Sequence, residues 1–161
     1  VSQHLDQIFN LATNLTRLVD EIVWAVNPSK DSIKGFVSHV ISHAQSYLLA
    51  AQIPCRLDVP AHLQDHPLSS TQRHHLLSII KEALHNIVKH ANATEVWLRI
   101  GSDERMLHVR IEDNGCGIST GPSGGDGLEN MHRRMELIGG SFERLNRPSG
   151  GTAISITLNL S

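Results

Sequence analysis

The stretch that decides the fold is residues 81–91, which read Lys-Glu-Ala-Leu-His-Asn-Ile-Val-Lys-His-Ala. It ends a helix that we predict over about residues 68–91, because apolar and polar side chains collect on opposite sides at 100° per residue. The apolar side consists of Leu76, Ile80, Ala83, Leu84, Ile87 and Ala91. The polar side, which we predict to face away from the core, consists of Glu82, Asn86, Lys89 and His90.

The polar side carries three kinds of chemistry about one helical turn apart. Glu82 lies a turn before Asn86, and Lys89 lies about a turn after it. A carboxylate can polarise an attacking group, an amide oxygen can ligate Mg²⁺, and a lysine can neutralise phosphate. A plain solvated face has the same pattern, so this helix alone leaves both interpretations open.

Residues 111–118 form a second informative stretch, Ile-Glu-Asp-Asn-Gly-Cys-Gly-Ile, in which a strand ends in an acid and two alternate glycines. Gly115 and Gly117 permit a tight turn and the close approach of a flat ligand. Asp113 can accept a hydrogen bond from an amine such as that of adenine. An ordinary glycine-rich turn between strands is the alternative.

Two further glycine segments follow. Residues 124–128, Gly-Gly-Asp-Gly-Leu, form a loop that ends at a helix N-terminus, a natural site for phosphate. Residues 150–152, Gly-Gly-Thr, precede the last predicted strand, where backbone amides can close a pocket.

In this order the four stretches closely resemble the N, G1, G2 and G3 boxes of the GHKL ATPases, a superfamily that includes the ATPase domains of gyrase, heat-shock chaperones, MutL and histidine kinases. The resemblance covers about residues 54–160. Within that range the first stretch, the short lid and residues 130–140 look like histidine kinases of the nitrate/nitrite-sensor type. His132 and Arg133 depart from the Gly-Met-Arg-Glu-Arg pattern usual there, whereas Arg134 keeps its last arginine.

The resemblance implies that the chain binds ATP with Mg²⁺ and transfers the γ-phosphoryl group to a histidine, with a response regulator as partner. It makes Glu82 the polarising catalytic base, Asn86 the catalytic Mg²⁺ ligand and Asp113 the reader of adenine. The nucleotide-binding positions that it implies are Asn86, Lys89, His90, Asp113, Gly115, Gly117, Gly125, Gly127, Leu128 and Thr152.

Around these boxes the periodicity predicts further helices over about residues 31–52 and 128–138, and strands over residues 55–59, 95–100, 106–112, 141–145 and 152–160. Helices followed by strands indicate an α+β fold. The resemblance makes it a two-layer α/β sandwich of the Bergerat type, a mixed sheet with helices on one face. We expect residues 55–59 at the sheet edge and residues 101–104 as a turn. No βαβ alternation and no GxxxxGK[ST] segment occurs, which argues against a Rossmann fold and excludes a P-loop.

The N-terminal segment has apolar residues spaced alternately by four and three, namely Val1, Leu5, Ile8, Ala12, Leu15, Val19, Ile22 and Val26. This spacing is typical of a coiled-coil or bundle seam, although a plain amphipathic helix shares it. Pro28 ends the helix.

Residues 18–28 resemble the second dimerisation helix of such kinases. We therefore expect two domains, residues 1–27 as part of a dimerisation hairpin and residues 28–161 as the ATP-binding catalytic domain. The first hairpin helix has no counterpart here, so the phosphoacceptor histidine is expected outside this fragment, and a homodimer in the full-length protein.

Composition restricts the expected partners, the location and the state of the cysteines. The formal net charge of -2 argues against a nucleic-acid partner. No apolar run approaches the roughly 20 residues that span a bilayer, so we expect a cytoplasmic fragment without membrane contact of its own, either of a soluble protein or of a membrane-bound sensor. Cys55 and Cys116 are expected to be reduced thiols.

Two alternative functions remain. One is a serine kinase of the anti-sigma-factor type, which ordinarily lacks a heptad helix in front of the same boxes. The other is a non-catalytic nucleotide-sensing module, against which the joint presence of Glu82, Asn86 and Asp113 argues.

Overall fold

The computed structural model describes residues 31–118 and 126–160 and, ahead of them, individual positions between His4 and Asn27. Its helices are α2 (Ile33–Ala50), α3 (Ser70–Asn86), the π-helical turn η2 (Ile87–Ala91) and α4 (Asp126–Leu137). Its strands are β1 (Cys55–Asp58), β2 (Val96–Ser102), β3 (Met106–Asp113), β4 (Gly140–Asn146) and β5 (Thr152–Asn159). Every helix and strand predicted between residues 31 and 160 is therefore present.

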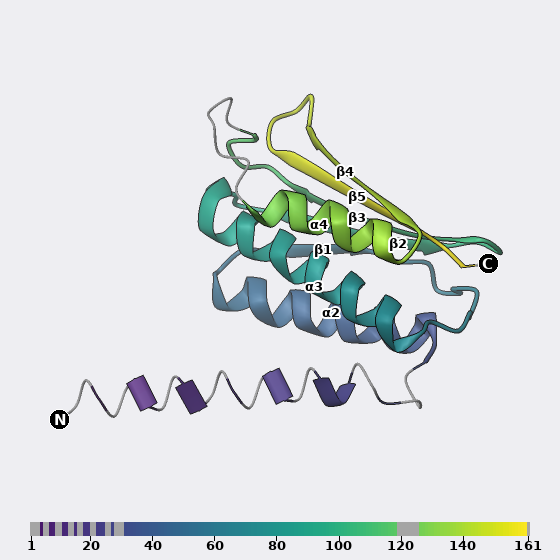
Figure 1. Cartoon of the computed structure of the whole chain (residues 1–161). Helices are drawn as coiled ribbons and strands as arrows, with labels where there is room; N and C mark the ends of the chain where they lie inside the picture. Colours follow the sequence, from purple (N-terminus) through teal and green to yellow (C-terminus); the bar gives the residue numbers. More distant parts are fainter. Residues whose placement is uncertain are drawn as a thin grey trace.

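The five strands form one mixed sheet in the order β1-β2-β3-β5-β4. Strand β1 runs parallel to β2 at the edge, as predicted, and the other neighbours are antiparallel. Helices α2, α3 and α4 lie together over one face of this sheet, and none of the described helices covers the opposite, open face (Figure 1). The predicted two-layer α+β sandwich is confirmed.

The core lies between the helix layer and the covered face of the sheet. Side chains of a strand alternate between its two faces, and in β3 this alternation buries Leu107, Val109 and Ile111 while His108 and Arg110 are exposed. The helices add apolar side chains such as Phe36 and Leu84, both fully buried. Burial of this kind is the main stabilising contribution to the fold.

Helix α3 begins at Ser70, within the predicted range, and Ser69 caps its N-terminus. The Ser69 hydroxyl accepts a hydrogen bond from the Gln72 backbone N–H at 3.1 Å, and the Gln72 side chain accepts one from the Ser69 N–H at 2.9 Å. This reciprocal capping box satisfies two N–H groups that the helix itself leaves unpaired. It fixes the start of the helix that carries Glu82 and Asn86.

The turn between β2 and β3 differs from the prediction. Gly101 and Ser102 were expected in a turn, but they pair with His108 and Leu107 as the last residues of β2. The reason is Asp103, whose carboxylate accepts the N–H groups of Arg105 and Met106, both at 2.9 Å. Because the aspartate closes the turn by itself, the two preceding residues remain in the ladder.

The described positions from His4 to Trp24 are helical, and the other residues of the helix predicted over 1–26 lie outside the described residues. At the end of this segment the Trp24 ring stacks on His39 with centroids 4.0 Å apart. It also lies 5.8 Å from the Arg73 guanidinium, so the segment contacts both α2 and α3. Among the described residues no helix is both long and apolar enough to cross a membrane.

Candidate functional site

A cavity of about 570 Å³ opens between α3, η2, the end of β3, α4 and β5. Most of the predicted site residues line this cavity, namely Glu82, Asn86, His90, Asp113, Gly117, Gly127, Leu128 and Thr152. They come from all four of the glycine-rich or polar stretches singled out in the sequence. The fold therefore joins stretches that are far apart in the chain into one site.

Asp113 provides a buried acidic group on the cavity wall. The residue is only 2% exposed, and its carboxylate accepts the N–H of Gly115 at 2.8 Å. A carboxylate has room for several hydrogen bonds, so Asp113 keeps acceptor capacity for a ligand amine. Burial away from competing water strengthens such a bond.

The turn after β3 packs directly under η2. The Cys116 N–H donates to the Ala91 carbonyl at 2.8 Å. A Cβ at Gly115 would lie 2.1 Å from that same carbonyl oxygen, so only glycine fits there. Gly115 is not among the residues that line the cavity, but it allows the turn to approach η2, and Cys116 and Gly117 of that turn do line it.

The π-helical turn explains why two neighbouring predictions differ in outcome. After Asn86 the helix widens, which offsets the 100° periodicity used to place the polar side. Lys89 and His90 are both exposed, but only His90 is among the residues that line the cavity. The polar side as a whole does not simply face solvent, because Glu82 and Asn86 are half-buried against the cavity. Gly125, predicted as a lid glycine, lies outside the described residues.

Several lining residues were not predicted from the sequence. Ile87, Met131 and Ile154 form an apolar part of the wall, and Arg144 reaches it from β4. Ile154 and Arg144 face each other across the β4–β5 ladder. The apolar members have the spacing of ordinary core residues, so no sequence signal distinguishes them from the core.

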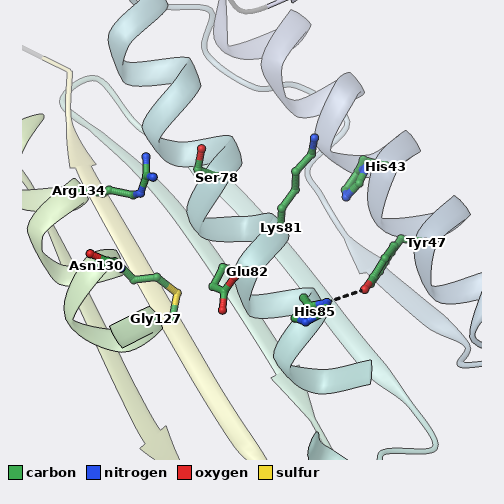
Figure 2. Close-up of a pocket in the computed structure, with 10 residues that line it drawn as sticks. His43, Tyr47, Ser78, Lys81, Glu82, His85, Gly127, Asn130 and Arg134 are labelled. Atoms are coloured by element: carbon green, nitrogen blue, oxygen red, sulfur yellow. Dashed lines mark hydrogen bonds between the residues drawn. The ribbon is translucent and has the colours of Figure 1, made fainter. Parts of the chain in front are cut away.

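A second hollow of about 680 Å³ adjoins the cavity, between α2, α3 and α4 (Figure 2). The two hollows share Glu82, Gly127 and Met131. The second hollow is lined by basic side chains that include Lys81 and Arg134, and its Tyr47 hydroxyl lies 3.2 Å from the His85 Nδ1. Glu82 thus stands where the two hollows meet.

His75 lies beside this second hollow, with its Nδ1 3.4 Å from a guanidinium nitrogen of Arg134. Burial lowers the pKa of the His75 imidazole, and the charges of Arg134 and His74 lower it further. His75 therefore favours its neutral form in the folded chain.

Comparison with known proteins identifies the class to which this fold and site belong. Residues 71–161 match the family described as "Histidine kinase-, DNA gyrase B-, and HSP90-like ATPase". Since this match covers more than half of the chain, the chain belongs to that family.

Among its relatives are the nitrate/nitrite sensor proteins NarQ and NarX of Escherichia coli strain K12, which are 37% identical over 112 residues and 34% identical over 108 residues. These matches cover 68% and 66% of this chain but only 20% and 16% of the relatives. The sensor protein VraS of Staphylococcus epidermidis is 33% identical over 96 residues, which cover 58% of this chain and 28% of VraS. The chain thus spans less than a third of the length of these relatives.

Solved structures share the fold. The histidine kinase domain of a blue-light activated histidine kinase from Erythrobacter litoralis superposes with a TM-score of 0.70 at 18% identity, covering 91% of this chain and 74% of that one. The ATP-binding domain of PrrB from Mycobacterium tuberculosis superposes with a TM-score of 0.59 at 25% identity, covering 78% of this chain and 94% of that one.

Proposed function

We propose that this chain is the ATP-binding catalytic part of a sensor histidine kinase and transfers the γ-phosphoryl group of ATP to a histidine outside the chain. The observation that carries the proposal is the convergence of Glu82, Asn86 and Asp113 on one cavity. Family membership supports ATP as the ligand, and the sensor proteins among the relatives favour a histidine kinase over a serine kinase or a non-catalytic module.

Adenine is proposed to bind at the Asp113 end of the cavity. There the carboxylate accepts a hydrogen bond from the exocyclic amine, and Ile87, Met131 and Ile154 contact the faces of the base. Leu128 and Thr152 complete the wall around the nucleotide. Gly117 lines the same cavity, and the turn requires glycine there, because its φ is +76° and a Cβ would lie 2.8 Å from the Asn146 side chain.

The phosphates are proposed to extend from this end toward Glu82 and the N-terminus of α4. Unpaired N–H groups at a helix N-terminus favour an anion, and Gly127 lies in the first turn of this 12-residue helix. His90 lines the same cavity and is kept as a phosphate contact. Lys89 is assigned no contact here, because it is not among the residues that line the cavity.

The residues present fit a magnesium ion bound with the nucleotide. Asn86 lines the cavity, and within the described residues no hydrogen bond engages its side chain, so its amide oxygen is available as a hard ligand. Mg²⁺ would neutralise phosphate charge there. A single amide oxygen matches the way Mg²⁺ usually binds, with few protein ligands and several phosphate or water oxygens.

Glu82 is proposed to polarise the acceptor. It is half-buried at the junction of the two hollows, and a Cβ on Gly127 would lie 3.0 Å from its Oε1. An acceptor histidine entering through the second hollow can donate its ring N–H to this carboxylate. The bond between the γ-phosphorus and the oxygen of ADP breaks as the imidazole nitrogen bonds to phosphorus, and Glu82 takes the imidazole proton. Positioning supplies most of the rate enhancement in such transfers.

We also propose that this chain is part of a larger protein, because it spans less than a third of the length of its relatives. Several described positions of the N-terminal helix carry exposed apolar side chains, among them Leu11, Leu15 and Ile22, which are 62%, 54% and 58% exposed. A row of such side chains favours helix association, here a homodimer. We also propose a response regulator as the phosphate recipient, a cytoplasmic location for this part, and a boundary near residue 28 between the helix and the catalytic domain.

A transfer assay tests the proposal. The chain is incubated with radiolabelled Mg-ATP and, as acceptor, the full gene product containing it with Asp113→Asn, which cannot use ATP itself. We expect label on the acceptor that acid removes and alkali does not, as for phosphohistidine. Acid-stable label would contradict the histidine kinase, and so would no label with an acceptor that folds.

A further inference from the structure

Glu112 is buried although it lies on the open face of the sheet. Alternation along β3 places it on the same side as His108 and Arg110, which are exposed. Its side chain is only 8% exposed because three arginines surround it. Arg99 and Arg110 approach its carboxylate at 3.0 and 3.2 Å, and Arg147 approaches at 3.3 Å.

Arg147 differs from the other two arginines in what else it holds. It comes from the turn between β4 and β5, and its side chain is 18% exposed. Its Nη1 donates to the Asp113 carbonyl at 2.8 Å, and its guanidinium carbon lies 4.7 Å from the centre of the Trp97 ring. One planar group therefore bridges the Glu112 carboxylate and the main chain of Asp113 while stacking on an aromatic face.

The backbone of the same turn holds Asp113 from a second direction. The Arg147 N–H donates to the Gly151 carbonyl at 2.9 Å, and the Gly150 N–H donates to the Arg147 carbonyl at 3.0 Å. Gly151 has φ of +87°, and a Cβ there would lie 1.9 Å from the Asp113 carbonyl oxygen. The Asp113 peptide is thus enclosed between the Arg147 side chain and the Gly151 backbone.

The side-chain carboxylate and the main-chain carbonyl of Asp113 have different surroundings. The carboxylate faces the cavity, while the carbonyl is held from the open side of the sheet by a residue that does not line the cavity. The orientation of the peptide sets the direction in which the Asp113 side chain leaves the main chain. A change in the carbonyl's partner therefore changes where the carboxylate points.

We propose that Arg147 is a positioning residue for nucleotide recognition, which holds the Asp113 main chain so that the carboxylate meets the amine of adenine. The inference rests on the proposed function, in which Asp113 reads adenine. Arg147 acts through Asp113 and touches no part of the nucleotide itself.

The surrounding charges make the role testable. When Arg147 is replaced, Glu112 keeps Arg99 and Arg110, so the buried carboxylate stays paired. Arg110 is the matched control, because it contacts the same carboxylate and the Ser155 hydroxyl, at 3.0 Å, and does not hold Asp113.

The experiment compares ADP with inosine diphosphate, which has a carbonyl oxygen where adenine has its amine. Titration calorimetry gives the dissociation constants for wild type, Arg147→Ala, Arg147→Lys and Arg110→Ala, with melting temperatures measured beside them. We expect Arg147→Ala to raise the dissociation constant for ADP about tenfold and to change that for inosine diphosphate little. The reason is that a misplaced carboxylate loses only the contact with the amine. Arg147→Lys falls between, since a lysine can reach the carbonyl or the carboxylate but not both. Arg110→Ala keeps the wild-type preference.

The ratio of the two dissociation constants decides the outcome, since a general loss of stability weakens the binding of both ligands by the same factor. An unchanged ratio in Arg147→Ala overturns the proposal, as does an equal fall in Arg110→Ala. If Arg147→Ala does not fold, an unchanged ratio in Arg147→Lys overturns it instead. Asp113→Asn is run in parallel, and full preference for ADP in that variant would refute the proposed function rather than the part assigned to Arg147.

Discussion

Gly115 lies where the chain leaving β3 passes beneath the last carbonyl of η2. No further carbon atom fits between them, because a Cβ at Gly115 would lie 2.1 Å from the Ala91 oxygen and 2.8 Å from the Ala91 Cβ. The turn beside the nucleotide site therefore requires glycine at this position, because only a hydrogen atom fits where other residues have a Cβ. The Asp113 carboxylate accepts the Gly115 N–H, so a displaced turn also moves the carboxylate that we propose to bind adenine.

Replacing Gly115 with alanine is expected to weaken ADP binding by about tenfold or more and to lower the melting temperature by several degrees, because η2 and the turn must separate. Calorimetric titration and thermal unfolding measure the two effects. Gly101→Ala is the matched control, since no atom lies within 4 Å of its Cβ position. Tight ADP binding by Gly115→Ala would show that the close approach is not required.

His75 gives the chain a predictable response to pH. Its pKa is lowered in the folded chain by burial and by Arg134, whereas in the unfolded chain it is near the ordinary value of about 6.5. As the pH falls below that value, the unfolded chain takes up a proton that the folded chain resists. The free energy of unfolding therefore decreases on this account as the pH is lowered from about 6.5 through the folded pKa.

Urea unfolding at pH 8 and pH 5.5 tests this sign. We expect His75→Gln to lose less stability between the two pH values than wild type does. His62→Gln, at an exposed histidine, serves as the control and should follow wild type. An equal loss in all three proteins would mean that another group carries the pH dependence.

At the scale of secondary-structure elements, Arg73 links α3 to the N-terminal segment. Its side chain is fully buried, pairs with Asp31 and donates to the Leu68 carbonyl at 3.1 Å. It also approaches the Asn27 carbonyl at 3.5 Å and lies over Trp24. The guanidinium thus fixes the start of the helix that carries Glu82 and Asn86.

Arg73→Ala is expected to lower the free energy of unfolding by about 3 kcal/mol, because it removes several buried partners and leaves a cavity. Urea unfolding measures the change. Arg105→Ala, an exposed arginine on the β2–β3 turn, should change stability by no more than about 0.5 kcal/mol. A similar small effect for Arg73→Ala would mean that the buried contacts contribute little.

The elements were predictable where each carries a local signal. Periodicity located α2, α3 and β2 within a few residues. The π-helical turn was not predictable, because residues 87–91 have no composition that distinguishes such a turn from an α-helix. Lys89 was predicted as a nucleotide contact from the 100° periodicity, which no longer holds beyond Asn86, and it is not among the residues that line the cavity.

At the scale of the whole molecule, the order of the four boxes was more informative than any one of them. Glu82, Asn86 and Asp113 reach one cavity because α3 packs on the face of the sheet where β3 ends. Met131 and Ile154 were missed since they differ from core residues only in what they face. Arg147 was not predicted either, because its contact with the Asp113 carbonyl joins residues that are 34 positions apart in the sequence.

The central claim is that the cavity binds Mg-ATP through Asp113. The most direct measurement is calorimetric titration of Mg-ATP into the wild-type chain and into Asp113→Asn. The account predicts binding by wild type and a loss on the order of 100-fold in Asp113→Asn, because the amide has only one oxygen acceptor and no charge. Equally tight binding of Mg-ATP by Asp113→Asn would contradict the nucleotide assignment.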